Sequence, residues 1–215
     1  MFHLVHHRVQ LPPLTYSLAV KAFPLAFCWW LYAVTGLVAL RYLTIPMFST
    51  LRKFTTVIVL LGETLFLHKR SPPSVWVSVL LIAAGGALAG VTDRSVSVPG
   101  YLLVGVCCLA TAAYLVLIVR VGASSGLDLV GMLYYNNLLS LPLVLAFLFG
   151  GTTEAATVGA FPSLREPSFW AVFGFSSALA TVLNFSIFFC TKVNSPLATN
   201  VTGQVKDVLT VTVGS

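Results

Sequence analysis

The chain has 215 residues, of which 58% are hydrophobic and only 8% are charged, and its formal net charge is +6. A soluble domain carries roughly 25% charged residues, so this composition excludes a water-soluble globular protein. Apolar runs of about 20 residues recur along the chain, each long enough to cross ~30 Å of hydrocarbon as a helix. They are too long and too continuously apolar to be barrel strands. The sequence therefore predicts an all-α, multi-pass membrane protein, with residues 1–215 in a single transmembrane domain.

Seven membrane spans are predicted where apolar runs are bounded by proline, glycine or charge. In chain order they cover residues 17–40, 45–67, 73–92, 100–121, 131–150, 168–190 and 195–213. The connections are short, and only residues 150–167 form a substantial polar loop. In the third span, Gly86 and Gly90 form a small-xxx-small pattern, which lets helices approach each other closely. We interpret that pattern as a packing motif.

The basic residues near the span ends are distributed unevenly between the two sides of the membrane. One side has six basic residues, namely Arg8, Lys21, Lys69, Arg70, Arg120 and Lys192. The other side has three, namely Arg41, Arg94 and Arg165. The side richer in Lys and Arg is expected to be cytoplasmic. The N-terminus is therefore predicted in the cytosol and the 150–167 loop on the luminal or outer face. Because these cations sit mostly singly, topology explains the net charge better than a nucleic-acid partner does.

Two segments of the chain share one layout and indicate an internal repeat. Each has a basic residue closing one helix, a proline opening the next and an intramembrane charged pair followed by Thr and Val: "RYLTIPMFSTLRKFTTVIV" (41–59) and "TKVNSPLATNVTGQVKDVLTV" (191–211). The copies sit five spans apart. An odd offset reverses the direction of crossing, so the copies would be inverted, as in many secondary transporters whose substrate binds at the repeat interface.

Charged residues lie well inside the predicted spans, at Arg52, Lys53, Glu63, Lys206 and Asp207. Each costs about 2.5–3.5 kcal/mol on insertion scales and usually faces a watery cavity or a partner. Arg52 and Glu63 share one helix face, but they are separated by about 16 Å along the axis and cannot touch.

The last span carries a polar stripe at helical spacing. It consists of Thr199, Thr202, Gly203, Lys206 and Thr210, with Gln204 and Asp207 flanking it. A cavity lined by Lys206, Arg52 and Lys53 would be cationic and would suit an anion, phosphate above all. Two alternatives remain open at this point: Lys206 could pair with Asp207 or Glu63 merely to be tolerated, and Arg52 or Lys53 could snorkel to the interface.

The fifth span contains "MLYYNNLLSLP", which sets two aromatic rings, Tyr134 and Tyr135, beside two amides, Asn136 and Asn137. Aromatic rings stack on nucleobases at ~1–3 kcal/mol per base, and amides can pair with a base edge. The alternative is a helix end at the membrane interface, where Tyr forms aromatic belts.

The four cysteines, Cys28, Cys107, Cys108 and Cys190, all lie in apolar stretches with no CxxC spacing and no neighbouring histidine. This placement favours small packing residues over a metal site or a disulfide. No metal or cofactor is predicted.

Several strings in order resemble the nucleotide-sugar transporters of the drug/metabolite transporter superfamily, solute carrier family 35. The strings cover roughly residues 20–215 and read "IPMFSTLRKFTTVIVLLGE", "AGVTDRSVSVPGY", "TAAYLVLIVRVGASSGLD", "LYYNN" and "NSPLATNVTGQVKDVLTV". They are most similar to the branch that carries UDP-N-acetylglucosamine and related UDP-sugars. The resemblance implies a ten-helix fold of two inverted five-helix halves that exchanges a cytosolic nucleotide sugar for a luminal nucleoside monophosphate, with no enzymatic activity.

The resemblance also implies roles for particular residues. Related GDP-mannose carriers hold the nucleotide with an aromatic-Tyr-Asn-Asn motif, which residues 134–137 match. Their Gly-Ala-Leu-Asn-Lys motif lies near the phosphates, and here it reads Gly203-Gln204-Val205-Lys206-Asp207. This departure puts GDP specificity in doubt. The resemblance implies that Lys206 binds the pyrophosphate. It gives less support to a binding role for Gln204 or Asp207.

The expected partners are a nucleotide sugar, a nucleoside monophosphate and the lipid bilayer of the Golgi apparatus or endoplasmic reticulum, with no nucleic acid; a homodimer is also considered. UDP-N-acetylglucosamine or UDP-N-acetylgalactosamine is the expected cargo. The alternatives are a GDP-sugar or triose-phosphate carrier of the same superfamily and a non-transporting membrane fragment. This sequence shows seven spans, whereas the family has ten. The order of the motifs suggests a partial chain that runs from the family's third helix to its ninth.

Overall fold

The computed structural model describes the backbone of residues 13–92, 97–151 and 161–213, with side chains over the same ranges except 89, 91–92, 151, 163 and 206–213. The described elements are all helical, and their bounds are α1 Tyr16–Ala39, α2 Ile45–Leu51, η1 Arg52–Phe54, α3 Thr55–Phe66, α4 Pro73–Thr92, α5 Val98–Ser125, α6 Leu129–Gly151, η2 Pro162–Arg165, α8 Pro167–Val193 and α9 Pro196–Val213.

Five segments among the described residues are long and apolar enough to cross a membrane. They are Tyr16–Ala39, Ile45–Phe66, Val98–Ser125, Leu129–Gly150 and Pro167–Val193, and Pro73–Leu88 is a shorter apolar helix. The predicted all-α, multi-pass membrane fold is thereby confirmed.

Proline and small polar residues explain where several helices begin and end. Pro46, Pro99 and Pro167 occupy the first turns of α2, α5 and α8, where their missing N–H groups leave no helical hydrogen bond unmade. The Ser97 hydroxyl accepts from Gly100 N at 3.4 Å at the start of α5. α5 ends at Gly126, whose φ of +66° is the left-handed conformation that favours glycine. These signals make α5 longer than the predicted 100–121 span.

The second predicted span is interrupted by a short 3₁₀ turn. Residues Arg52–Phe54 form η1 between α2 and α3. A 3₁₀ turn inside a helix often marks a functional position or a hinge. Here it carries the intramembrane pair Arg52-Lys53, and the Arg52 guanidinium lies over the Phe48 ring at 5.7 Å.

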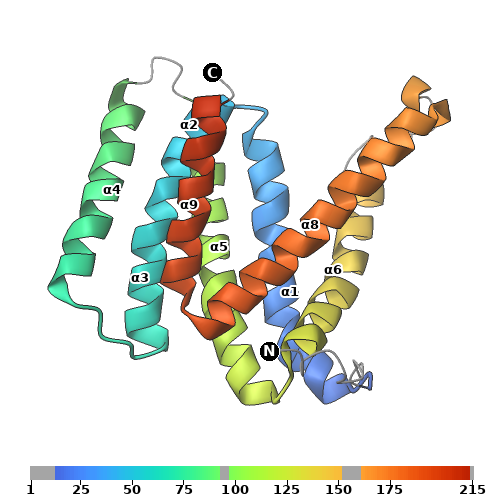
Figure 1. The fold of residues 1–215 in the computed structure, drawn as a ribbon, viewed down its shortest axis with the longest axis horizontal. Helices are drawn as coiled ribbons and strands as arrows, with labels where there is room; N and C mark the ends of the chain where they lie inside the picture. Colours follow the sequence, from blue (N-terminus) through green and yellow to red (C-terminus); the bar gives the residue numbers. More distant parts are fainter. Residues whose placement is uncertain (1–12, 93–96, 152–160, 214–215) are drawn as a thin grey trace, which may run out of the picture.

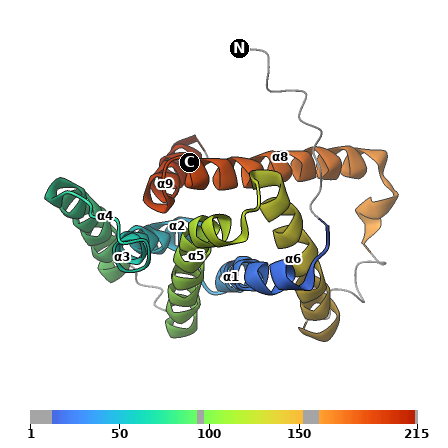
Figure 2. The same ribbon diagram turned by 90° about the horizontal axis from the view of Figure 1, so that it is seen from below.

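Helix α5 forms the centre of the bundle and contacts α1, α3, α8 and α9. α4 lies at one edge of the bundle (Figure 1). On the opposite side, α8 runs at a steep angle to α9, so that the two helices are close at the turn that joins them and move apart away from it. Seen from below, α8 runs along one side of the bundle while α1 lies on the other (Figure 2). One core cluster surrounds Tyr114, Tyr135 and Phe188, and a second surrounds Met47 and Cys108.

The Gly86–Gly90 motif packs α4 closely against α2 and η1, as the sequence predicts. A Cβ on Gly86 would lie 3.2 Å from the Thr50 carbonyl oxygen, and one on Gly90 would lie 3.6 Å from Met47 Cε. A Cβ on neighbouring Gly85 would meet nothing within 4 Å.

Replacing Gly86 with leucine should therefore destabilise the protein by about 1–3 kcal/mol, because the backbone of α2 cannot yield to the added side chain. Gly85→Leu is the matched control, since both changes bring the same gain in helix propensity. The denaturation midpoints of both variants in detergent micelles provide the measurement. Equal midpoints would contradict the close packing of α4 on α2.

Candidate functional site

A cavity of about 430 Å³ lies between α8, α9 and the central helices. This volume is within the ~300–1,000 Å³ typical of small-molecule sites. Its wall brings together residues that are far apart in the sequence, contributed by α1, α2, η1, α5, α8 and α9: Tyr32, Ser49, Arg52, Thr111, Tyr114, Leu115, Leu183, Ser186, Ile187, Cys190, Thr199, Asn200, Thr202, Gly203 and Gln204.

The described wall of this cavity is mostly apolar, but it carries several polar groups and a single formal charge. That charge belongs to Arg52, which is half-buried on η1. Hydroxyl and amide groups supply the remaining polar atoms, chiefly along α9, and the rings of Tyr32 and Tyr114 supply an aromatic surface. A guanidinium surrounded by neutral hydrogen-bonding groups suits an anion, and phosphate matches its fork of donors.

The α9 side of the cavity is fixed by hydrogen bonds to α3. The fully buried Thr56 hydroxyl accepts from Asn200 Nδ2 at 3.0 Å and also from Gln204 Nε2. On the other flank, Thr191 Oγ1 of α8 donates to Thr199 Oγ1 at 3.0 Å. These contacts hold the polar residues of α9 in place.

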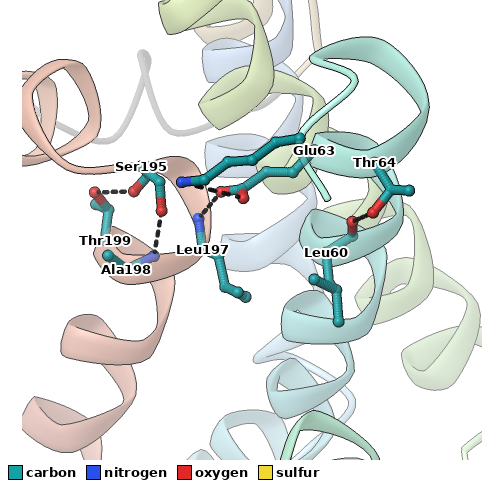
Figure 3. Close-up of polar contacts among 8 residues, drawn as sticks. Leu60, Glu63, Thr64, Ser195, Leu197, Ala198 and Thr199 are labelled. Atoms are coloured by element: carbon teal, nitrogen blue, oxygen red, sulfur yellow. Dashed lines mark hydrogen bonds and ion pairs between the residues drawn. The ribbon is translucent and has the colours of Figure 1, made fainter. Parts of the chain in front are cut away.

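Glu63 joins the end of α3 to the first turn of α9 (Figure 3). Its side chain is 1% exposed, and Oε1 accepts from the Leu197 N–H at 2.6 Å. Ser195 Oγ accepts from Ala198 N at 3.1 Å, and Pro196 has no N–H to satisfy. The first-turn donors of α9 are thus bonded, and the carboxylate also lies at the positive end of the helix dipole.

The charged partner of Glu63 comes from the segment that follows α3, and not from α9. Lys69 Nζ lies 3.9 Å from Glu63 Oε2. The backbone returns to Glu63 at this point because His68 has a φ of +51°, and Lys69 N donates to the Glu63 carbonyl oxygen at 3.2 Å. Lys206 is nine residues after Leu197, roughly 13 Å farther along the α9 axis, so this geometry disfavours a Lys206–Glu63 pair.

Lys206 and Asp207 belong to α9, but their side chains lie outside the described residues. The backbone register nevertheless gives their level along the helix bundle. α3 and α9 run antiparallel, with Leu197 bonded to Glu63 and Gln204 bonded to Thr56. Continuing this register puts Lys206 level with the Arg52-Lys53 pair.

The Tyr134–Asn137 segment on α6 is absent from the described cavity wall. Tyr135 is fully buried, and its hydroxyl donates to Pro13 O at 2.7 Å and accepts from Thr15 N at 3.0 Å. The half-buried Tyr134 ring packs edge-on against Tyr135 at 5.8 Å, and Asn137 is exposed. Asn136 is fully buried, and neither polar atom of its amide has a partner among the described residues.

The remaining predicted site residues divide between the cavity and the α4 interface. Gly203 and Gln204 line the cavity beside Arg52. Lys53 does not, and its Cβ would lie 3.8 Å from a Cβ on Gly86, so it faces α4.

Sequence reasoning missed Tyr32, Ser49 and Tyr114, which line the cavity from α1, α2 and α5. The one sequence signal for Tyr114 is a phenol in the middle of an otherwise apolar span, "LATAAYLVLIV". The described residues contain no group of three or more His, Cys, Asp or Glu side chains that could hold a metal ion.

No protein-family model matches this chain, but individual proteins do. A protein of Dictyostelium discoideum, named provisionally as a UDP-sugar transporter, is 42% identical over 91% of this chain and 50% of its own length. The UDP-N-acetylglucosamine transporter UGNT1 of Arabidopsis thaliana is 35% identical over 89% of this chain and 55% of its own length. The GDP-mannose transporter GONST1 of the same plant is 30% identical over 81% of this chain and 54% of its own length.

The chain therefore spans about half the length of these relatives. Their names describe carriers and not enzymes, in agreement with the expectation from the sequence. Over about nine tenths of its length, this chain is thus similar to proteins named as UDP-sugar and nucleotide-sugar transporters.

Proposed function

We propose that this protein carries a UDP-sugar across a Golgi membrane in exchange for a nucleoside monophosphate, with UDP-N-acetylglucosamine or UDP-N-acetylgalactosamine as the cargo. The observation that carries the proposal is the cavity, whose described wall combines one guanidinium, that of Arg52, with hydrogen-bonded polar residues of α9. The similarity to UDP-sugar carriers over about nine tenths of the chain supports the nucleotide-sugar part of it. The transporter works without covalent chemistry, within a ten-helix inverted-repeat fold.

Arg52 and Lys206 hold the phosphates in this proposal. Arg52 comes from the α2–η1–α3 segment and Lys206 from α9, which are the two copies of the predicted inverted repeat. Because α3 and α9 run antiparallel, the backbones of the two residues lie at about the same level along the bundle. Both exchanged ligands are phosphate anions, so one cationic site can accept each in turn. This shared site favours exchange over one-way flow.

Within the Tyr-Tyr-Asn-Asn segment, the structure supports different roles for its members. Tyr135 already uses its hydroxyl to fix the chain before α1. Asn136 keeps an unpartnered amide in the protein interior, and such a group costs about 1–3 kcal/mol unless it is satisfied. Base recognition by this segment would therefore fall to Asn136, although the residue is not part of the described cavity wall.

The cations support an orientation with the Glu63 end of the bundle in the cytosol. Arg120 lies over the Phe66 ring at the end of α3, at 5.9 Å. Lys192 Nζ donates to Leu127 O at 3.3 Å, and Lys69 lies beside Glu63. These three cations thus gather at one end of the bundle, and the side rich in Lys and Arg is normally cytoplasmic.

A GDP-sugar is the second candidate cargo, because the chain is also 30% identical to a GDP-mannose transporter. A competition panel on the full-length protein in proteoliposomes tests both. Uptake of labelled UDP-N-acetylglucosamine should be inhibited by unlabelled UDP-sugars and by UMP and should be accelerated by UMP inside the vesicles. Stronger inhibition by GDP-mannose would favour the second candidate. Preference for triose phosphate, or no uptake at all, would overturn the proposed function.

A further inference from the structure

The phenol of Tyr114 is a buried polar group of the cavity wall that has no partner. The side chain is 2% exposed, and its hydroxyl makes no hydrogen bond to any described residue. Three other described residues have buried polar atoms without partners, namely Trp30, Thr55 and Asn136, but none of them lines the cavity. Among the side chains that the structure describes, only Tyr114 combines an unsatisfied hydroxyl with a place in the cavity wall.

Neighbouring rings fix the Tyr114 side chain in position. Its ring lies 5.5 Å from that of Tyr32, at an interplanar angle of 50°. The Phe188 ring meets it edge-on, at 5.8 Å and 81°. A ring packed between α1 and α8 in this way loses little further freedom when a ligand arrives, so a hydrogen bond from its hydroxyl would be preorganised.

Tyr114 and Arg52 lie at different levels along the bundle, with Tyr114 nearer the end of α3 that carries Glu63. Helices α3 and α5 run side by side, with Cys108 Sγ donating to Leu51 O at 3.9 Å. Farther along, Val116 Cγ2 would lie 3.0 Å from a Cβ on Gly62. By this register Tyr114 is roughly 8 Å farther along the helix axes than Arg52. Because the two residues are offset along the bundle, we assign the group bound at Tyr114 to a different part of the ligand from the phosphate held at Arg52.

We propose that the Tyr114 hydroxyl hydrogen-bonds to an uncharged polar group of the ligand, on its base, ribose or sugar, while Arg52 holds a phosphate. This assignment rests on the proposed function and adds a specificity-determining residue to it. A phenol both donates and accepts, so it can exchange hydrogen bonds with a hydroxyl or a base edge.

The test is Tyr114→Phe in the full-length protein, with Tyr101→Phe as the matched control. Tyr101 is on the same helix, and its hydroxyl donates to Gly90 O at 3.4 Å, away from the cavity. Tyr114→Phe should weaken inhibition by UDP-N-acetylglucosamine about three- to tenfold, as expected for one lost hydrogen bond. It should not lower the denaturation midpoint, because the hydroxyl it removes makes no hydrogen bond to any residue that the structure describes. Tyr101→Phe should leave inhibition unchanged and lower the midpoint slightly.

Inorganic pyrophosphate provides the second arm, because it has no uncharged part to bind at Tyr114. Its inhibition should be the same in wild-type protein and in Tyr114→Phe. An equal loss for pyrophosphate and for the nucleotide sugar would place Tyr114 at the phosphates and overturn the assignment. Unchanged nucleotide-sugar inhibition in Tyr114→Phe would overturn it too, while leaving the proposed function intact. A wild-type protein that binds no nucleotide sugar would overturn both.

Discussion

Replacing Arg52 with alanine should lower nucleotide-sugar affinity by roughly 10- to 100-fold, the loss expected when a charge-assisted hydrogen bond is removed. Arg52 is the single charged residue in the described cavity wall, so no described neighbour can take over its role. Lys206→Ala should have an effect of the same size, because the α9 register places Lys206 at the same level. The measurement is uptake of labelled UDP-N-acetylglucosamine by the full-length protein, normalised to the amount inserted in the membrane.

Two companion substitutions separate phosphate binding from general damage. Arg52→Lys keeps the charge but loses the planar fork of donors, so it should retain part of the affinity. Lys53→Ala removes the adjacent charge, which faces α4 and not the cavity, and should change uptake little. If Lys53→Ala proved as damaging as Arg52→Ala, the assignment of Arg52 to the cavity would be wrong.

The positions of the helices could be predicted from sequence because the bilayer imposes the same length and apolarity on every span. Proline marked some of the boundaries, as at Pro196. The predicted end of the fourth span at residue 121 fell short of Gly126, where α5 ends. The 3₁₀ turn at Arg52–Phe54 could not be predicted, since no proline or glycine marks it in the sequence. It depends on how the η1 backbone packs against α4 and α5.

Part of the site also followed from sequence. Charge in an apolar span is costly, so Arg52 was a sound candidate, and helical spacing put Gly203 and Gln204 on one side of α9. The position of Tyr135 could not be inferred in this way. The residue types favour base stacking, but the hydroxyl instead bonds Pro13 and Thr15, about 120 residues away along the chain. Such a contact depends on how α1 and α6 pack, which no local pattern encodes.

Glu63→Ala should be the most destabilising single change at the α3–α9 interface, by about 1.5–3 kcal/mol. The side chain is 1% exposed, and its carboxylate accepts the Leu197 N–H, which a methyl group cannot do. The substitution also removes the negative charge from the N-terminus of α9, where it interacts favourably with the helix dipole. The denaturation midpoint in detergent micelles reports the loss.

The partners of Glu63 supply the controls that decide which of its contacts matters. Glu63→Gln keeps an oxygen acceptor for Leu197 N but loses the charge, so its loss should be smaller than that of Glu63→Ala. Lys69→Ala should cost at most about 1 kcal/mol, because the Lys69 side chain is 53% exposed and its Nζ lies 3.9 Å from the carboxylate. A larger loss for Lys69→Ala than for Glu63→Ala would mean that the ion pair, and not the bond to the first turn of α9, holds the two helices together. Because α9 carries much of the polar wall of the cavity, a weakened Glu63 contact should also lower uptake, in proportion to the fraction of protein that loses the α3–α9 arrangement.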